Sequence, residues 1–389
     1  MTSSPLTPFA ELQRIAAKSG IGPALDYLEQ NVRREKNYPA LFEVLKMRVR
    51  HGLKLPLLYS DIPDVLSEED QRMLEDGLIT ACREVGTLLM KEGDVQQGWM
   101  YLQPVGDREL NLKLLKTIKP DDENIDMLID TAITQGAAPA YGYRLLLEHY
   151  GTCNGITTFE TQSMAYDRAT QKEMACVLLD HIYKELMSNI RYSFSQCKPP
   201  IEVPEEETLA ETMRKHPDLC GNGAHHIDTT HLASLMRISR LVDDCEHLMK
   251  AYELAVYGSR LALDFHYPGH APFEDTYTDH LQYFGALVSA GDVDVSAAVE
   301  HFRKKLETVD SEQHGPIAAE TLVDFLFRLG RNSEALDVTI TLLLGKFPSM
   351  GIAPDPMTIA NTEELRDRLI AYYRDQNDLV SFAAGVLGR

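Results

Sequence analysis

Apolar residues recur along most of this chain at the three- and four-residue spacing of amphipathic helices. The pattern is clear over residues 10–20, 22–36 and 38–52, and a longer stretch follows over 168–194. Further segments of the same kind continue after residue 279 and reach the C-terminal end. Nowhere does the sequence show several runs of alternating β-branched residues bounded by turns, so we expect little β-sheet. The pattern therefore predicts an all-α fold.

Local signals indicate where these helices begin and end. Gly20 and Gly52 follow apolar helical runs and should stop them, whereas Ser67 precedes an acidic first turn and should cap a helix. Residues 149–165 are polar and contain glycines, so we expect them to interrupt the helices. Three prolines and an acidic run mark residues 196–210 as the clearest linker or exposed loop.

The length of 389 residues allows two or three domains or one elongated repeat array. These boundaries predict an N-terminal helical-hairpin region (1–195), a proline- and glutamate-rich linker or loop (196–210), a histidine-rich functional segment (211–285) and a C-terminal helical-hairpin region (286–389).

A weak repeat runs through the helical regions. Each copy has an apolar helix end, a glycine turn, and then a residue that opens a second apolar helix and is small in most copies. A turn glycine lets the first helix end in a left-handed conformation, and a small residue lets the second helix approach closely. The copies pair Gly93 with Gly98, Gly136 with Tyr141, Gly330 with Ala335, and, with two residues inserted, Gly291 with Ala297.

This pattern resembles the helix–turn–helix hairpin of tetratricopeptide-like repeats, although that family's regular period is absent. The resemblance implies stacked antiparallel helix hairpins, arranged as a TPR-like α-solenoid or an irregular αα-superhelix. It also implies a scaffold that binds a protein partner. Any helical hairpin with a glycine turn would give the same pattern, so an irregular helical domain is the alternative.

Composition and charge narrow the class of protein. With 44% hydrophobic and 25% charged residues, the chain has the composition of a soluble globular protein. Its net charge of −21 disfavours nucleic acid as a partner. We expect no membrane partner either, because no apolar stretch is long enough to span a bilayer. Six cysteines without a CxxC pair, and an N-terminus unlike a signal peptide, predict a cytoplasmic protein.

Eight of the thirteen histidines lie between residues 216 and 280, and several occupy glycine- or proline-broken loops beside carboxylates. Imidazole and carboxylate together suit a divalent metal or a proton-transfer site. The predicted metal ligands are His225, His226, His231, His266, His270 and His280, with Asp228, Glu274 and Cys220 as candidate catalytic residues.

The first part of this segment should form one wall of the site. Asp228 or a neighbouring threonine should cap a helix that runs on past His247, and His231 opens its expected buried stripe. That stripe continues, at alternating steps of four and three residues, through Leu235, Ile238, Val242, Cys245 and Met249. His225 and His226 approach from the preceding loop. The H-x-D spacing of His226 and Asp228 occurs in facial-triad iron oxygenases, but on a β-sandwich, so only the ligand chemistry carries over.

The second wall should come from the loop in which His266 and His270 flank a Tyr-Pro-Gly turn. Zn or Fe would then be held by His226, His231 and one or two histidines of this loop or of the following helix start. Asp228 or Glu274 would serve as a ligand or as general base on a metal-bound water.

Each residue also has an ordinary structural interpretation, which taken singly is the commoner one. Asp228 can be only a helix cap, the loop histidines can be satisfied locally, and His247, off the buried stripe, is expected at the surface. Cys220 could serve a Cys/His pair or be a buried, inert thiol.

Three functions follow from these observations. The first is a metal-dependent enzyme, hydrolase or oxygenase, acting on a small-molecule or peptide substrate. The second is a non-catalytic TPR-like scaffold that binds a protein or peptide, and the third is a metal-free acid–base or nucleophilic enzyme that uses the histidines and Cys220.

Overall fold

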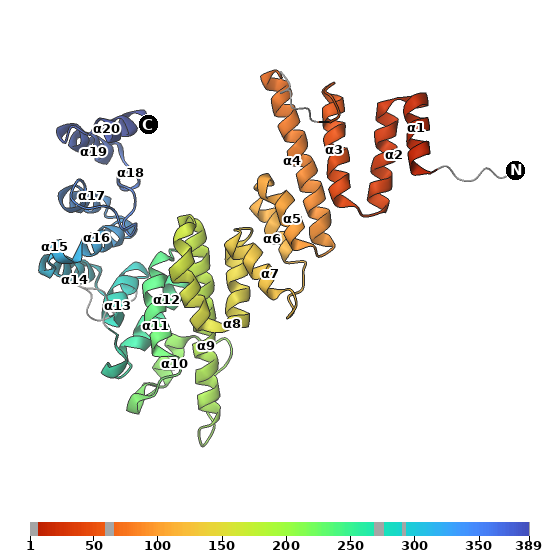
Figure 1. Cartoon of the computed structure of the whole chain (residues 1–389). Coiled ribbons are helices and arrows are strands. Elements are labelled where there is room, and N and C mark those ends of the chain that lie inside the picture. Colours follow the sequence, from red (N-terminus) through yellow and green to blue (C-terminus); the bar gives the residue numbers. More distant parts are fainter. Residues whose placement is uncertain (1–6, 59–65, 268–275, 290–292, 389) are drawn as a thin grey trace. The chain divides into compact units, whose positions relative to one another are not determined.

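The computed structural model describes residues 7–58, 66–267, 276–289 and 293–388. Every regular element within these ranges is a helix, and they contain no strand (Figure 1). The prediction of an all-α fold is confirmed. No helix in these ranges combines the length and apolarity that crossing a membrane requires. The chain divides into two compact units, residues 1–149 and 150–389, and each is described by itself.

The helices of the first unit are α1 (Pro8–Ser19), α2 (Ile21–Arg34), α3 (Tyr38–Gly52), α4 (Glu68–Lys91), α5 (Val95–Leu102), α6 (Arg108–Leu115) and α7 (Ile125–Ile129), followed by the π-helical turn η2 (Asp130–Thr134). Helices α1 to α5 pack each on the next, α6 packs on α4, and α7 packs on α5 (Figure 1). Gly20 ends the first helix with φ 92°, and the Ser67 hydroxyl accepts a hydrogen bond from the Asp70 N–H, as predicted. Gly52 is still helical, and Leu53 follows it as the cap.

The hairpin of α4 and α5 has the predicted local geometry. Gly93 turns the chain with φ 88°. A Cβ atom at Gly98 would lie 2.8 Å from Met90 Cγ and 3.2 Å from the Gly86 carbonyl oxygen, so only glycine allows the two helices to approach this closely.

Two further predicted hairpins turn at glycines with positive φ, Gly136 and Gly330. In the first, the residue that packs tightly against η2 is Gly142 rather than Tyr141. In the second, Ala335 is fully buried. Gly291 lies outside the described residues.

Helix α8 (Pro139–Gln162) contains the interruption predicted for residues 149–165, but only as a kink at one residue, and most of the rest of that stretch is helical. The only non-helical residue within the described α8 is Gly151, with φ 79° and ψ 176°. After it the helix resumes and buries Ile156 and Phe159. The polar residues are accommodated because the Thr157 and Thr161 hydroxyls donate to backbone carbonyls four residues earlier.

The second unit is organised around α9 (Arg168–Ser195), which matches the predicted helix over 168–194 and packs against α11 and α12. The proline-rich segment after it lies within this unit. The Arg191 guanidinium donates to the carbonyl oxygens of Pro204 and Glu205 at 3.1 and 2.9 Å. Helix α10 (Leu209–Lys215) follows with a Thr208/Glu211 capping box.

The helix expected to run from Asp228 past His247 is two helices, so that prediction was wrong. α11 (Thr229–Ile238) continues into the 3-10 turn η5 (Ser239–Leu241), and α12 (Cys245–Ser259) follows. The chain is extended at Val242, and the Asp244 carboxylate then caps α12. Because α12 begins anew at this cap, its residues do not continue the buried face of α11. Cys245 and Met249 are therefore exposed instead of buried.

The remaining helices complete this unit, and α16 is the most buried of them. Contacts join α12 to α13 and α16 to both α14 and α17. The elements are α13 (Thr276–Leu287), α14 (Val295–Thr308), α15 (Ser311–His314), α16 (Ile317–Arg328), α17 (Asn332–Val338), the π-helical turn η7 (Thr339–Leu343), α18 (Pro356–Ile359), α19 (Glu363–Asp375) and α20 (Leu379–Leu387).

Candidate functional site

A cavity of about 570 Å³ lies in the second unit, lined by the end of α8, the start of α9, α11 with η5, α13, α14, α16 and residues 350–352. Its size is that of pockets that bind small ligands or a few side chains. Apolar side chains form much of the wall, including Phe159, Ile238, Leu241, Phe302, Ile317 and Ile352.

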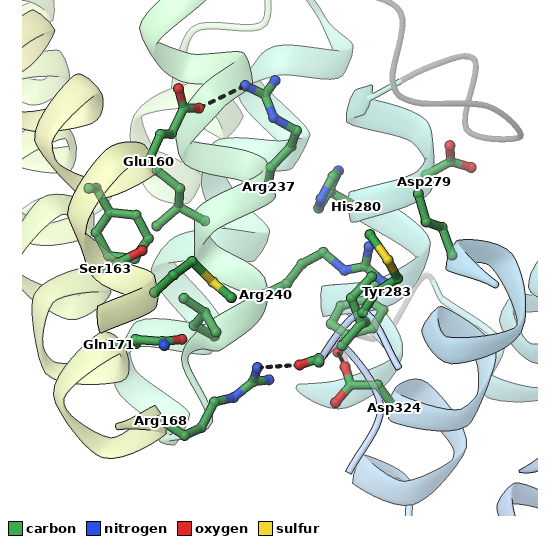
Figure 2. Close-up of a pocket in the computed structure, with 18 of the residues that line it drawn as sticks. Glu160, Ser163, Arg168, Gln171, Arg237, Arg240, Asp279, His280, Tyr283 and Asp324 are labelled. Carbon is green, nitrogen blue, oxygen red and sulfur yellow. Dashed lines mark hydrogen bonds and ion pairs between the residues drawn. The ribbon is translucent and has the colours of Figure 1, made fainter. Parts of the chain in front are cut away.

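Three arginines surround this apolar space: Arg168, Arg237 and Arg240 (Figure 2). Arg168 is exposed and donates to the Gly351 carbonyl oxygen at 3.1 Å. Arg237 lies 3.3 Å from a carboxylate oxygen of Glu160, and both side chains are exposed. The Arg240 guanidinium lies over the Tyr283 ring, 5.1 Å from its centroid. The lining also contains the carboxylates of Glu160, Asp279 and Asp324, so the three arginines supply guanidinium groups at this cavity without a net positive charge.

Buried polar groups hold the wall behind Arg240. The Tyr283 hydroxyl donates to Asp324 at 2.5 Å, and burial raises the pKa of this tyrosine, so it stays a protonated donor. Arg328 donates to the carbonyl oxygens of Val242 and Arg240, each at 2.7 Å. These bonds connect α13 and α16 to the segment around η5 and fix the backbone from which Arg240 extends.

A buried carboxylate fixes the wall at residues 350–353. Glu320, on α16, accepts backbone hydrogen bonds from Met350, Ile352 and Ala353 at 2.7, 2.9 and 3.3 Å. Three prolines between residues 347 and 358 predict a loop over this segment. No sequence signal indicates that Glu320, thirty residues earlier, holds them.

Of the predicted metal ligands that the structure describes, His280 lines this cavity. It is buried, its Nδ1 donates to the Thr276 carbonyl oxygen at 2.5 Å, and its ring stacks on Phe284. Its neighbour Asp279 is also buried and accepts from His301 Nε2 at 2.6 Å. Both side chains are therefore part of the packed wall.

Asp228 has the capping role that the sequence offered as its ordinary interpretation. Its carboxylate accepts from the backbone N–H of Thr230 at 2.8 Å and of His231 at 3.4 Å. The Thr230 hydroxyl also donates to it, and this bond lowers the pKa of Asp228. All three bonds go to the same oxygen, Oδ1, so a metal that left them intact would have to bind Oδ2.

The histidine pair before Asp228 is divided between surface and interior. His225 is exposed and its ring lies 4.7 Å from the Phe265 ring. His226 is half-buried, and its backbone N–H donates to the Tyr257 hydroxyl at 2.9 Å. Burial lowers the pKa of His226, which favours the neutral imidazole.

The other predicted residues lie elsewhere in the unit. His266 Nε2 donates to the Leu261 carbonyl oxygen at 3.2 Å. Cys220 is buried beside a second cavity of about 560 Å³ that Arg260 also lines, and burial raises the pKa of its thiol to about 11. His270 and Glu274 lie outside the described residues, so the complete predicted ligand set is not tested by this geometry.

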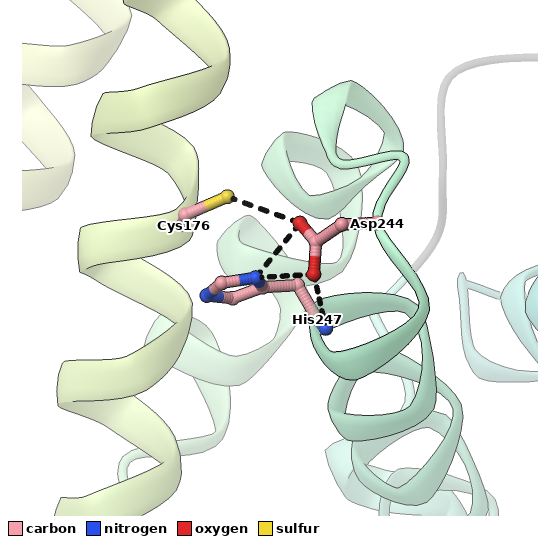
Figure 3. A group of neighbouring side chains, drawn as sticks. All are labelled: Cys176, Asp244 and His247. Atoms are coloured by element: carbon pink, nitrogen blue, oxygen red, sulfur yellow. Dashed lines mark hydrogen bonds and ion pairs between the residues drawn. The ribbon is translucent and has the colours of Figure 1, made fainter.

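A different group of ligand-type side chains does meet within the described part of the chain. The group consists of one potential ligand atom from each of three residues, and these atoms lie within 4.8 Å of one another (Figure 3). The residues are Cys176, Asp244 and His247. His247, expected at the surface, is half-buried with 18% of its side chain exposed. Its spacing from Asp244 is visible in the sequence, but Cys176 comes from a helix far earlier in the chain. No local pattern could have joined the three.

Comparison of the chain with protein-family models, with curated proteins and with solved structures gives no match. The interpretation of this protein therefore rests on its own residues.

Proposed function

We propose that this protein is a non-catalytic helical-hairpin binding protein whose second unit accepts an acidic, partly apolar segment of a partner protein. The observation that carries the proposal is the cavity of about 570 Å³ in which apolar walls meet Arg168, Arg237 and Arg240. The resemblance of the hairpins to tetratricopeptide-like repeats supports it, because helical repeats of that kind bind partners on their concave surfaces.

The chemistry of the cavity favours a carboxylate. A guanidinium group presents a planar fork of donors that matches the two oxygens of a carboxylate. Arg237 is paired with Glu160 at the surface, where ion pairs contribute about 1 kcal/mol or less. A carboxylate brought in by a ligand can replace this partner, while the apolar walls take the neighbouring side chains.

The walls are also held in place before any ligand arrives. Glu320 fixes residues 350–353, and the bonds of Tyr283, Asp324 and Arg328 fix the wall around Arg240. A preorganised site loses less conformational entropy on binding, so more of the interaction energy contributes to affinity.

Fluorescence anisotropy with labelled short peptides tests this function. The library contains peptides with one glutamate among leucine and phenylalanine, each matched by a peptide with glutamine in its place. Binding should favour the glutamate peptides, and Arg168→Gln and Arg237→Gln, made as single variants, should each weaken it about tenfold or more, the loss of about 1.4 kcal/mol. Arg14→Gln, which removes the same charge from an exposed site on α1, is the control.

Equal binding of the acidic and amide peptides would contradict the proposal. Weakening by Arg14→Gln as large as that by the cavity variants would also contradict it, because the effect would then follow net charge alone.

The metal-dependent hydrolase or oxygenase is the second proposal, with Zn or Fe at the histidine-rich segment. The occurrence of its candidate ligands in glycine- and proline-broken loops supports it, whereas the capping role of Asp228 leaves only the Oδ2 oxygen of that carboxylate for a metal. Metal analysis of untagged protein beside His231→Ala and His266→Ala tests it. A near-stoichiometric metal lost from both variants would favour this enzyme over the binding protein.

The metal-free enzyme that relies on Cys220 has less support. With the pKa of its thiol raised to about 11, Cys220 is protonated at neutral pH and is a weak nucleophile. Rapid alkylation of Cys220 in the folded protein would reverse this assessment.

A further inference from the structure

One face of α9 packs against the start of α12, and it carries Lys172, Cys176 and Asp180 at four-residue spacing. From α12, Asp244 and His247 meet the middle of this row. Cys176 Sγ lies 3.9 Å from Asp244 Oδ2, and His247 Nδ1 lies 2.8 Å from both Asp244 oxygens (Figure 3). His247 Nε2 lies 3.5 Å from Asp180 Oδ2.

We infer that Cys176, Asp244 and His247 form a binding site for a divalent transition metal, with zinc as the preferred ion. Zinc takes thiolate, imidazole and carboxylate ligands at about 2.0–2.3 Å in a tetrahedral arrangement, which places two ligand atoms roughly 3.3–3.6 Å apart. The separations of 2.8 and 3.9 Å lie on either side of these values, so small side-chain rotations bring the three onto one ion.

The charges around the group favour a cation at this position. Lys172 pairs with Asp243, and Lys250 pairs with both Asp180 and Glu246. Among the described ion pairs, none joins Asp244 to a lysine or an arginine. Its side-chain partners are a thiol and an imidazole, which are the two other side chains that a transition metal would bind. As the cap of α12, Asp244 also accepts the His247 backbone N–H at Oδ1, so Oδ2 is the oxygen that would bind the metal.

The proton balance of binding is simple. The half-buried thiol donates weakly to Asp244, and its partial burial, followed by the charge of Asp244, raises the pKa of Cys176 to about 12. The metal replaces this proton, which leaves to solvent as the metal–sulfur bond forms. The neutral His247 ring then carries its proton on Nε2, where Asp180 lies within reach as acceptor. Water fills the fourth position.

This site shares no residue with the histidine-rich ligand set, and it is independent of the arginine cavity. Its consequence for the fold is a cross-link between α9 and the first turn of α12.

Titration of chelator-treated, untagged full-length protein with Co²⁺ tests the inference. Co²⁺ bound by a thiolate gives a sulfur-to-metal charge-transfer absorption in the near ultraviolet. We expect this band to saturate at one Co²⁺ per chain and to disappear on addition of Zn²⁺. Cys176→Ser should abolish the band, and His247→Gln should weaken Co²⁺ binding about tenfold or more. Cys245→Ser, which removes the exposed thiol next to Asp244, should leave the band unchanged.

The inference is overturned if the wild-type protein shows no thiolate band, if the band persists in Cys176→Ser, or if it is lost in Cys245→Ser. Co²⁺ held by the histidine-rich segment would bind without a thiolate band and would survive both site variants, which also overturns it. If circular dichroism shows that Cys176→Ser is misfolded, the effect of His247→Gln on Co²⁺ affinity decides the outcome.

Discussion

Asp228 illustrates, at the scale of one residue, how a carboxylate oxygen can accept hydrogen bonds from the backbone of the helix that it caps. Because it caps α11, Asp228→Ala should lower the free energy of unfolding by about 1 kcal/mol, whereas Asp228→Asn, which caps equally well, should cost much less. Urea denaturation measures both. Equal losses for the two variants would show that the negative charge, rather than the cap, is what the protein requires.

His226 should make stability depend on pH. Burial lowers its pKa in the folded protein, so the unfolded chain binds the proton more readily. The contribution is therefore present above the unfolded pKa of about 6.5 and is lost as pH falls through the lower folded value. His226→Gln should flatten the melting-temperature profile over this range. A profile as steep as that of the wild type would assign the dependence to other groups.

Single residues differ in how far the sequence could predict their roles. Ser67 and Asp228 were predictable as caps, because a cap bonds to a backbone N–H two or three residues along the chain. Glu320 and Cys176 were not, because their partners lie on distant segments and become neighbours only after folding.

At the scale of helices, the contact between α12 and α13 depends on Gly258. A Cβ atom there would overlap the ring of the buried Tyr277, so Gly258→Ala should destabilise the protein by about 1–3 kcal/mol. Gly22, on α2, is the matched control, since the nearest side-chain atom to its Cβ position is 4.0 Å away. Thermal unfolding should show Gly22→Ala neutral or slightly stabilising. Equal losses at both positions would rule out a specific contact at Gly258.

Helix type was more predictable from the sequence than helix continuity. The period of apolar residues identified α9 almost to its ends, but it also continued across Val242, where the chain leaves the helix. The apolar pattern reports which residues prefer burial. The pattern does not show that a new helix begins at Asp244, because an aspartate would also be tolerated on the exposed face of an unbroken helix.

At the scale of the whole molecule, a segment rich in proline and acidic residues lies within one compact unit. Proline and acidic residues made residues 196–210 look like the clearest linker, yet they bond to α9 within one unit. The division instead falls next to Gly151, where one residue with positive φ interrupts an otherwise helical stretch. The glycines of residues 149–165 indicated this interruption in the sequence, but they did not indicate that it is confined to one residue.

The three hydrogen bonds that Glu320 accepts should also determine how often residues 350–353 move away from the cavity. Residues 350–353 can leave the cavity wall only when the carboxylate releases its amide hydrogens. Glu320→Gln has one acceptor oxygen instead of two, so hydrogen exchange at Met350, Ile352 and Ala353 should accelerate. Unchanged exchange would show that other contacts hold the segment. If exchange does accelerate, the residence time of a bound ligand should follow the lifetime of these three hydrogen bonds. The arginines would instead determine the rate at which the ligand binds.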